Sequence, residues 1–278
     1  MTIDVVIVSF NSANDLPGCI GAVRQWDRTG RVIVVDNASD DNSASVGQAL
    51  ADEVVVSGRN VGYGAGQNLG VRRATAPFFL ALNPDARVVP DALERGYVIA
   101  DGRQDVAAVQ GVVLRARDQA PERTHGREPG LADLVSHRFR LRQRLGEGAL
   151  QRAAPLLGFR YFSDRVPTGA VDTPFLAAVA PLVRRSAFAG VGGFDEGYFL
   201  YAEDIDLSRR LRMRGWRLLS LPDVWAYHEG GASTASEPTL RDNEWWRSHR
   251  RFVEQHWTGP RRVVGLALTR SYRAPSDE

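Results

Sequence analysis

The stretch IDVVIVSFNSANDLPGCIGAVRQWDRTGRVIVVD, residues 3–36, places a helical pattern between two apolar runs. The runs at residues 3–9 and 31–36 are rich in β-branched residues, which favour strands. Continuous apolar strands separated by helices are typical of a parallel sheet covered on both faces, so we predict an α/β fold. The alternation continues, with strands expected at 53–57, 78–83 and 106–114 and helices at about 14–26, after 40, at 66–74 and from 91.

Polar residues directly follow four of these predicted strands. In parallel sheets of this kind, ligands bind beyond the carboxyl ends of the strands. We therefore expect the four segments to line one pocket. They are Ser9-Phe10-Asn11, Asp36-Asn37-Ala38-Ser39-Asp40, residues 59–64 and Asn83-Pro84-Asp85.

The composition excludes several classes of protein. A single cysteine, Cys19, rules out an internal disulfide framework and a multi-cysteine metal site, and we expect a reducing cytoplasmic environment. The sequence contains no lysine, which excludes Schiff-base chemistry and a lysine-containing phosphate loop. No apolar run approaches the roughly 18 residues of a membrane span, and no basic leader precedes the first strand, so we expect a chain that does not cross a bilayer.

The pattern of strands and helices changes after residue 114. Residues 115–165 contain eleven Arg against six Asp or Glu, although the whole chain has a net charge of only +2. We expect a nucleotide-facing half at 1–114, an Arg-rich insertion on the acceptor side at 115–169, and an acceptor-binding and catalytic half of the same domain at 170–273. Residues 274–278 are expected to form a tail.

Two segments combine arginines with apolar residues at helical spacing. In the first, Leu131, Leu134, Val135, Phe139 and Leu145 alternate with arginines, which is typical of a helix over a core or on a membrane. The second holds Trp245, Trp246, Phe252 and Trp257 before Arg261 and Arg262. We expect both to pack on the protein, with peripheral contact to the inner membrane face left open.

The stretch GGFDEGYFLYAEDIDLSRRL, residues 192–211, places three carboxylates behind an aromatic loop. Glu203, Asp204 and Asp206 fit the first turn of a helix, where acids complement the dipole, with arginines in its last turn and Gly215 beyond it. The same cluster could supply a general base. The residues alone leave both interpretations open.

Asp36 raises the question of a dinucleotide fold, because an acid after the second strand binds a ribose there. Such a fold requires Gly-x-Gly-x-x-Gly directly after the first strand. This chain has Ser9-Phe10-Asn11-Ser12-Ala13-Asn14 at that place, and its glycines come later, at 62, 64, 66 and 70. A dehydrogenase is therefore disfavoured.

Asn83-Pro84-Asp85 and His228 are the candidate metal ligands. The tripeptide places a carboxylate on a stiff loop after an apolar strand, and oxygen ligands of this kind suit Mg²⁺ or Mn²⁺. His228 ends another strand-like run and could add an imidazole. Taken singly, Asn-Pro-Asp is also a common turn, and a histidine at a strand end is often structural.

Taken in order, these residues resemble the family 2 inverting glycosyltransferases with the GT-A fold, especially their bacterial rhamnosyltransferase branch. The resemblance implies a Rossmann-like, mostly parallel central sheet with helices on both faces and a C-terminal acceptor side. Its landmarks lie between residues 5 and about 233. They are Val8 to Asn11, Val34 to Asp40, Asn60 to Gly64, Asn68-Leu69-Gly70, Asn83-Pro84-Asp85, Val191 to Asp206, and His228.

The resemblance also implies a role for individual residues. Asp204 would be the general base, with Glu203 beside it. Asp85 would hold Mg²⁺ or Mn²⁺, and His228 would approach the metal or the diphosphate. Asn83 replaces the first acid of the family's Asp-x-Asp motif, so its ligation is not assigned. The residues expected to contact the nucleotide-sugar are Ser9, Asn11, Asp36, Asn60, Gly62, Asn68, Asn83 and Asp85.

The implied function is a metal-dependent, inverting transfer of a sugar, with dTDP-rhamnose as the expected donor, to a hydroxyl in envelope polysaccharide or glycoconjugate synthesis. The acceptor would be a glycan, a lipid-linked sugar or a small molecule, and no nucleic acid is expected as a partner. A UDP-sugar-dependent transferase that decorates a small natural product is an alternative. A non-catalytic scaffold that binds a nucleotide-sugar is another, disfavoured because Asp36, Asp85 and Asp204 are all present. The sequence does not indicate an oligomeric state.

One segment departs from the family pattern. Members typically carry a glycine before the Leu-Val-Arg-Arg run, whereas residues 174–185 read PFLAAVAPLVRR, with no glycine and with Pro181. Because this segment normally lies near the acceptor, an unusual acceptor pocket is expected.

Overall fold

The computed structural model describes residues 1–141, 144, 166–230 and 238–270. Within these residues, nine strands form one sheet in the order β3-β2-β1-β4-β10-β6-β11-β5, with β8 paired to β11. A separate pair joins β7 (His125–Gly126) and β9 (Phe175–Leu176). The strands of the large sheet are β1 (Ile3–Ser9), β2 (Thr29–Asp36), β3 (Glu53–Val56), β4 (Phe78–Leu82), β5 (Ala86–Val88), β6 (Val106–Arg115), β8 (Val171–Asp172), β10 (Leu182–Arg184) and β11 (Arg217–His228).

The sheet is mostly parallel, as predicted. β1 pairs in parallel with β2 and β4, β2 with β3, and β6 with β11. The sequence did not predict two short antiparallel strands: β10, which lies between β4 and β6, and β5, which lies at the edge beside β11. Each has three residues, too few to give a periodic pattern of its own.

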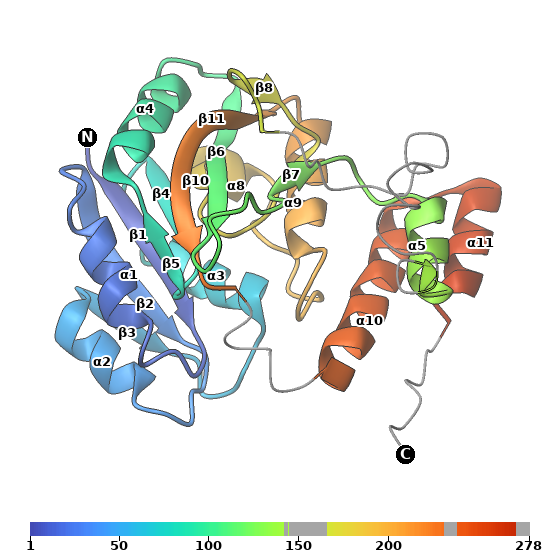
Figure 1. Ribbon diagram of the computed structural model, residues 1–278, viewed down its shortest axis with the longest axis horizontal. Helices are drawn as coiled ribbons and strands as arrows, with labels where there is room; N and C mark the ends of the chain where they lie inside the picture. Colours follow the sequence, from blue (N-terminus) through green and yellow to red (C-terminus); the bar gives the residue numbers. More distant parts are fainter. Residues whose placement is uncertain (142–143, 145–165, 231–237, 271–278) are drawn as a thin grey trace.

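Helices cover both faces of the sheet (Figure 1). Ile3, Val5 and Ile7 of β1 face a core that α1 and α4 complete, while Val6 and Val8 face a second core that includes residues of α3, α8 and α9. Burial on both faces explains the continuous apolar run of β1. The helices are α1 (Leu16–Val23), α2 (Ser43–Leu50), α3 (Tyr63–Val71), α4 (Pro90–Asp101), α5 (Leu131–Arg138), α8 (Arg185–Gly190), α9 (Glu203–Met213), α10 (Pro238–His256) and α11 (Gly259–Leu268).

A third, smaller core joins α5, α10 and α11, which group beside α9 and away from the sheet (Figure 1). Trp246, Phe252 and Trp257 are buried, so the expected packing of the C-terminal aromatic residues is confirmed. Phe139 is 51% exposed, so the predicted apolar stripe of the Arg-rich segment does not stay buried over its whole length. Leu145 and the tail at 274–278 lie outside the described residues. None of the described helices is both long enough and apolar enough to span a membrane.

Two histidines in this third core are held in the neutral form. Trp245 is stacked between His137 and His249, with ring centroids 3.7 Å apart on each side. Burial lowers the pKa of His137 and lowers that of His249 to about 3. The imidazoles are therefore uncharged in the folded protein at neutral pH.

We predict that acid destabilises the protein through His249. Because its pKa is lower in the folded state, the stabilisation is complete above the unfolded pKa of about 6.5 and is lost as the pH falls toward 3. Between pH 6.5 and 5 this loss amounts to about 2 kcal/mol. Urea unfolding at pH 7.5 and 5.0 should show that acid lowers the free energy of unfolding less for His249→Phe than for the parent. An equal fall in both proteins would contradict a neutral His249.

Candidate functional site

The carboxyl ends of β1 and β2 place Ser9 and Asp36 side by side, since the two residues are register partners. Ser9 is fully buried and Asp36 is 3% exposed. Asp36 Oδ2 accepts a hydrogen bond from the Ser39 amide at 3.3 Å. Within the described part of the chain, the Ser9 hydroxyl and Asp36 Oδ1 have no hydrogen-bond partner. Buried polar atoms without partners are rare, and here they leave donors and acceptors for a ligand.

The exit loops of these two strands are tied together through Asn11. Asn11 has a positive φ of 51°. Its amide donates to Ser39 Oγ at 3.0 Å, and its Oδ1 accepts from the Asp40 amide at 2.8 Å. Asn11 is exposed at this edge, and its contact with a nucleotide stays a prediction.

Asn37 connects this edge to the loop before α3. Its Nδ2 donates to Asn60 Oδ1 at 2.8 Å, and its Oδ1 accepts from the Val61 amide at 2.9 Å. Asn60 Oδ1 also accepts from the Gly62 amide at 3.0 Å. The predicted residues Asn60 and Gly62 therefore belong to the same hydrogen-bonded loop system as the Asp36 segment. Asn37 lies in the polar segment at residues 36–40, but the sequence did not predict that it connects this segment to the loop before α3.

Gly62 allows the donor-side loop to touch the loop before α9. Its φ is 84°, and a Cβ there would overlap the carbonyl group of Phe199. The next amide, that of Tyr63, donates to this carbonyl at 3.2 Å. Only glycine permits both the left-handed backbone and the close approach.

Asn68 makes a second connection between α3 and the same loop. Its Oδ1 accepts from the Phe194 amide at 2.9 Å, and its Nδ2 donates to the Phe194 carbonyl at 2.9 Å and to Glu196 at 3.1 Å. These bonds occupy the side-chain amide, which is 7% exposed. The structure thus gives Asn68 a positioning role, and direct contact with a nucleotide stays a prediction.

Asp85 and His228 meet at the ends of β4 and β11. His228 Nε2 lies 3.1 Å from Asp85 Oδ1 and 3.3 Å from Asn83 Nδ2, while its Nδ1 lies 3.0 Å from Glu122. Burial opposes charge on both residues, but their mutual hydrogen bond keeps the pKa of Asp85 below its ordinary value. Hydrogen bonds to Asp85 and Glu122 raise the pKa of His228 to about 10.

The arrangement fits a divalent ion that a ligand helps to coordinate. Adjacent ligands about 2.1 Å from an octahedral ion lie about 3.0 Å apart, which is close to the separation of Asp85 Oδ1 and His228 Nε2. A Glu122 carboxylate on Nδ1 leaves Nε2 as the coordinating nitrogen, and an ion that binds there would displace the proton that Nε2 shares with Asp85. The described residues contain no group of three or more protein ligands. Mg²⁺ usually takes one or two carboxylates plus substrate phosphates, so two side chains are compatible with it.

The acid pair Glu203 and Asp204 begins α9 after an unusual turn. Tyr201 and Ala202 both have left-handed φ values, 68° and 63°. The Asp204 carboxylate accepts from the Ile205 amide at 2.8 Å and from the Ala178 amide at 3.4 Å. Burial raises the pKa of Asp204 to about 6, and burial together with the charge of Asp204 raises that of Glu203 to about 8. A carboxyl group with a pKa near 6 can accept a proton at neutral pH.

Tyr63 connects the start of α3 to the segment that binds Asp204. Its hydroxyl donates to the Ala178 carbonyl at 2.9 Å and accepts from Gln67 at 3.1 Å. Burial raises the pKa of this hydroxyl. Because the Ala178 amide donates to Asp204, Tyr63 and Asp204 bind the same residue.

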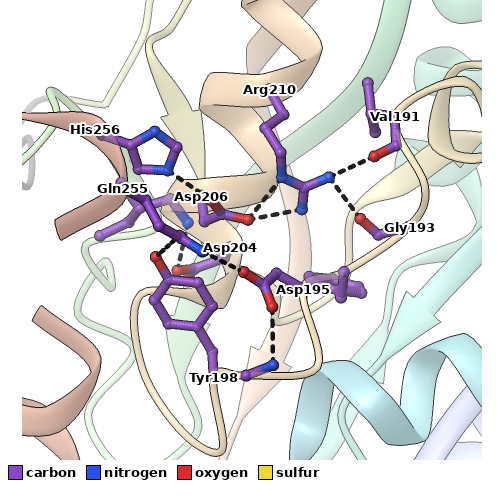
Figure 2. A network of polar contacts seen from close by, with 12 residues as sticks. Val191, Gly193, Asp195, Tyr198, Asp204, Asp206, Arg210, Gln255 and His256 are labelled. Atoms are coloured by element: carbon purple, nitrogen blue, oxygen red, sulfur yellow. Dashed lines mark hydrogen bonds and ion pairs between the residues drawn. The ribbon is translucent and has the colours of Figure 1, made fainter. Parts of the chain in front are cut away.

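Asp206, the third acid of the cluster, has a structural role. It is 1% exposed and lies between Arg210 Nε at 2.8 Å and His256 Nε2 at 2.6 Å (Figure 2). Arg210 also donates to the carbonyls of Val191 and Gly193. The acids do start a helix, as one sequence interpretation predicted, while a general base at Glu203 or Asp204 stays a prediction.

Helix α10 holds the loop that precedes α9. Arg251 and Gln255 bind Asp195. Gln255 also accepts from the Tyr198 hydroxyl at 2.8 Å (Figure 2). Ser248 Oγ donates to the Leu200 carbonyl at 2.7 Å. Because these partners are about 50 to 60 residues apart, no local pattern could have identified them. Glu122, within the Arg-rich insertion, was missed for the same reason.

Comparison with known proteins agrees with this geometry. Residues 4–189 match the family model described as glycosyl transferase family 2. The chain is 27% identical over 255 residues to the N-acetylglucosaminyl-diphospho-decaprenol L-rhamnosyltransferase of Mycobacterium tuberculosis, covering 82% of this chain and 80% of that protein. It is 28% identical over 231 residues to the rhamnosyltransferase WbbL of Escherichia coli K12, covering 81% and 82%. The mannosyltransferase PcManGT of Pyrobaculum calidifontis, solved with GDP-Man and Mn²⁺, superposes with a TM-score of 0.60 at 18% identity, covering 96% of this chain and 69% of that one. The predicted GT-A fold is confirmed.

We predict that Gly62→Ala destabilises the protein more than Gly58→Ala does. Both glycines have positive φ, which costs an alanine about 1–2 kcal/mol, but nothing lies within 4 Å of a Cβ at Gly58. At Gly62 the overlap with Phe199 adds a further cost of about 1–3 kcal/mol. Urea unfolding of the two variants measures the difference. If both variants lost the same free energy of unfolding, the contact with Phe199 would not be required for stability.

Proposed function

Because the chain belongs to glycosyl transferase family 2, we propose that it transfers L-rhamnose from dTDP-rhamnose to a hydroxyl of a lipid-linked sugar, with inversion at the anomeric carbon. One observation carries this function. The Tyr63 hydroxyl donates to the Ala178 carbonyl, and the Ala178 amide donates to the Asp204 carboxylate, so the starts of α3 and α9 meet at Ala178. We infer that the proposed base and the donor loop before α3 border one site.

Asp204 is the general base in this mechanism. An acceptor hydroxyl becomes an effective nucleophile when a carboxylate takes its proton as the new bond forms, a contribution of roughly 10²–10⁴-fold. The Ile205 and Ala178 amides fix the Asp204 carboxylate, and its pKa of about 6 leaves it ionised at neutral pH. Burial and the charge of Asp204 raise the pKa of Glu203, which favours one negative charge on the pair rather than two.

The donor occupies the edge formed by the ends of β1, β2 and β4. Ser9 and Asp36 offer buried atoms without partners to the nucleoside. Asp85 and His228 would hold Mg²⁺ or Mn²⁺ at the diphosphate. Such an ion, when bound, neutralises charge on the departing nucleoside diphosphate. Glu122 keeps the His228 ring oriented toward this position.

Two relatives support the choice of sugar and acceptor. The Mycobacterium tuberculosis and Escherichia coli proteins are both named as rhamnosyltransferases, and the name of the first includes a lipid diphosphate acceptor. Each alignment covers about four fifths of this chain and of the relative. An acceptor of this kind would bring the chain to the surface of a membrane.

We expect dTDP-rhamnose to be hydrolysed or transferred faster than UDP-glucose, UDP-N-acetylglucosamine, UDP-galactose and GDP-mannose, each with Mn²⁺. Asp204→Asn should lower kcat by about 10²–10⁴-fold while dTDP still binds, because the base is lost and the donor edge is intact. Preference for a UDP-sugar in this panel would reject the proposed donor.

Glu203→Gln is the matched control. Because burial and the charge of Asp204 favour the protonated form of Glu203, the variant should retain activity and the same rise of kcat/KM with pH near 6. The activity of both proteins should fall below pH 6 as Asp204 takes up a proton. A loss in Glu203→Gln as large as that in Asp204→Asn would assign the base to Glu203.

We also predict that Asp85→Ala abolishes the part of dTDP binding that depends on Mn²⁺, measured by calorimetry with and without the ion. Asp15→Ala is the control, because Asp15 is a neighbouring carboxylate that acts on Asp85 only through its charge. Its dTDP affinity should stay within a few-fold of the parent. If Asp85→Ala and the parent bound dTDP with equal affinity in Mn²⁺, metal binding by this loop would be contradicted.

A further inference from the structure

A cavity of about 380 Å³ lies between α3, α10 and the loop that α10 holds. Its walls come from the segment after β3, from one face of α3, from residues 196–199 and from Arg247 of α10. Ser9, Asp36, Asp85 and His228 do not line it, whereas Asn60, a predicted nucleotide contact, does, so the cavity adjoins the donor edge. No role was predicted for Arg72 and Arg247, two of the arginines that line it.

The cavity is lined by three arginines and one carboxylate. Arg72 is only loosely paired with Glu196, at 3.8 Å, and both side chains are more than half exposed. Glu196 also accepts from Asn68. Arg247 approaches Glu244 at 3.5 Å. The guanidinium of Arg59 has no hydrogen bond or ion pair with any described residue. The cavity therefore has an excess of positive charge, and guanidinium groups suit phosphate oxygens.

Apolar side chains form the rest of the wall. Val61, Ala65, Leu69 and Phe199 lie beside the arginines. A ligand that combines a phosphate group with a short hydrocarbon would match both parts of the surface. A free inorganic ion would leave the apolar part in contact with water.

The cavity lies close to the acid pair. Phe199 lines it, and the Phe199 carbonyl accepts from the Tyr63 amide at 3.2 Å. The other end of the same tyrosine, its hydroxyl, donates to the Ala178 carbonyl at 2.9 Å. Tyr63 therefore connects the cavity wall to Ala178, whose amide donates to Asp204.

We propose that this cavity binds the diphosphate of a prenyl-linked acceptor, with Arg59, Arg72 and Arg247 as its phosphate ligands. This assignment rests on the proposed function. The phosphates would occupy the cavity, the first carbons of the prenyl chain would lie against Leu69 and Phe199, and the sugar would extend toward Asp204. A diphosphate is also part of the donor, so the test must distinguish the two sources.

The probe is geranyl diphosphate, titrated by calorimetry into protein saturated with dTDP and Mn²⁺, with Mn²⁺ at equal concentration in cell and syringe. One equivalent should bind although the donor edge is occupied. Arg72→Ala and Arg247→Ala should each weaken this binding about tenfold, because each removes charge-assisted hydrogen bonds. The affinity for dTDP should not change in either variant.

Arg73→Ala and Arg250→Ala are the matched controls. Arg73 is as exposed as its neighbour, at 59%, but faces Glu53, and Arg250 pairs with Glu254 on α10. Both should bind geranyl diphosphate like the parent. The proposal would be overturned if geranyl diphosphate and dTDP competed for one site. It would also be overturned if the controls and the cavity variants lost the same affinity for geranyl diphosphate. The proposed function fails separately, if the parent neither binds dTDP nor turns over dTDP-rhamnose.

Discussion

The buried carboxylate of Asp206 is the contact on which the acceptor side depends. A charge that is 1% exposed needs partners, and they come from Arg210 on its own helix and from His256 at the end of α10. Arg210 carries the connection on to the backbone at Val191 and Gly193. These bonds connect α9 both to α10 and to the loop at residues 191–193, beside the acid pair at the start of α9.

Residues that carry the family resemblance also join the two sides of the site to each other. Gly62 admits the Phe199 carbonyl, and Asn68 binds both backbone groups of Phe194. Asn37 connects the same loop to the Asp36 segment. Movement of the donor loop would therefore be transmitted to the loop that leads into Glu203. The glycines and asparagines of these motifs are needed for the shape of the site whether or not each touches a ligand.

Much of the fold and part of the site could be predicted from the sequence. Runs such as 3–9 are apolar at every position that meets a core, and polar residues follow them where the chain leaves the sheet, so both signals are local. β5 and β10 could not be predicted, because three-residue strands are defined by their neighbours. The same holds for Glu122 and for the hydrogen bonds of α10, whose partners are distant in sequence. Asp204 and Asp206 are both acids in the first turn of α9, so the sequence alone could not predict that Asp206 binds Arg210 and His256.

The position of β10 constrains the order in which the sheet can be completed during synthesis. β4 and β6 are both translated before β10, yet they do not pair with each other, because β10 lies between them. Until residues 182–184 have left the ribosome, the nascent chain carries unpaired strand edges at β4 and β6, and such edges promote association between chains. A ribosome that pauses between β6 and β10 would hold the protein in its most aggregation-prone form.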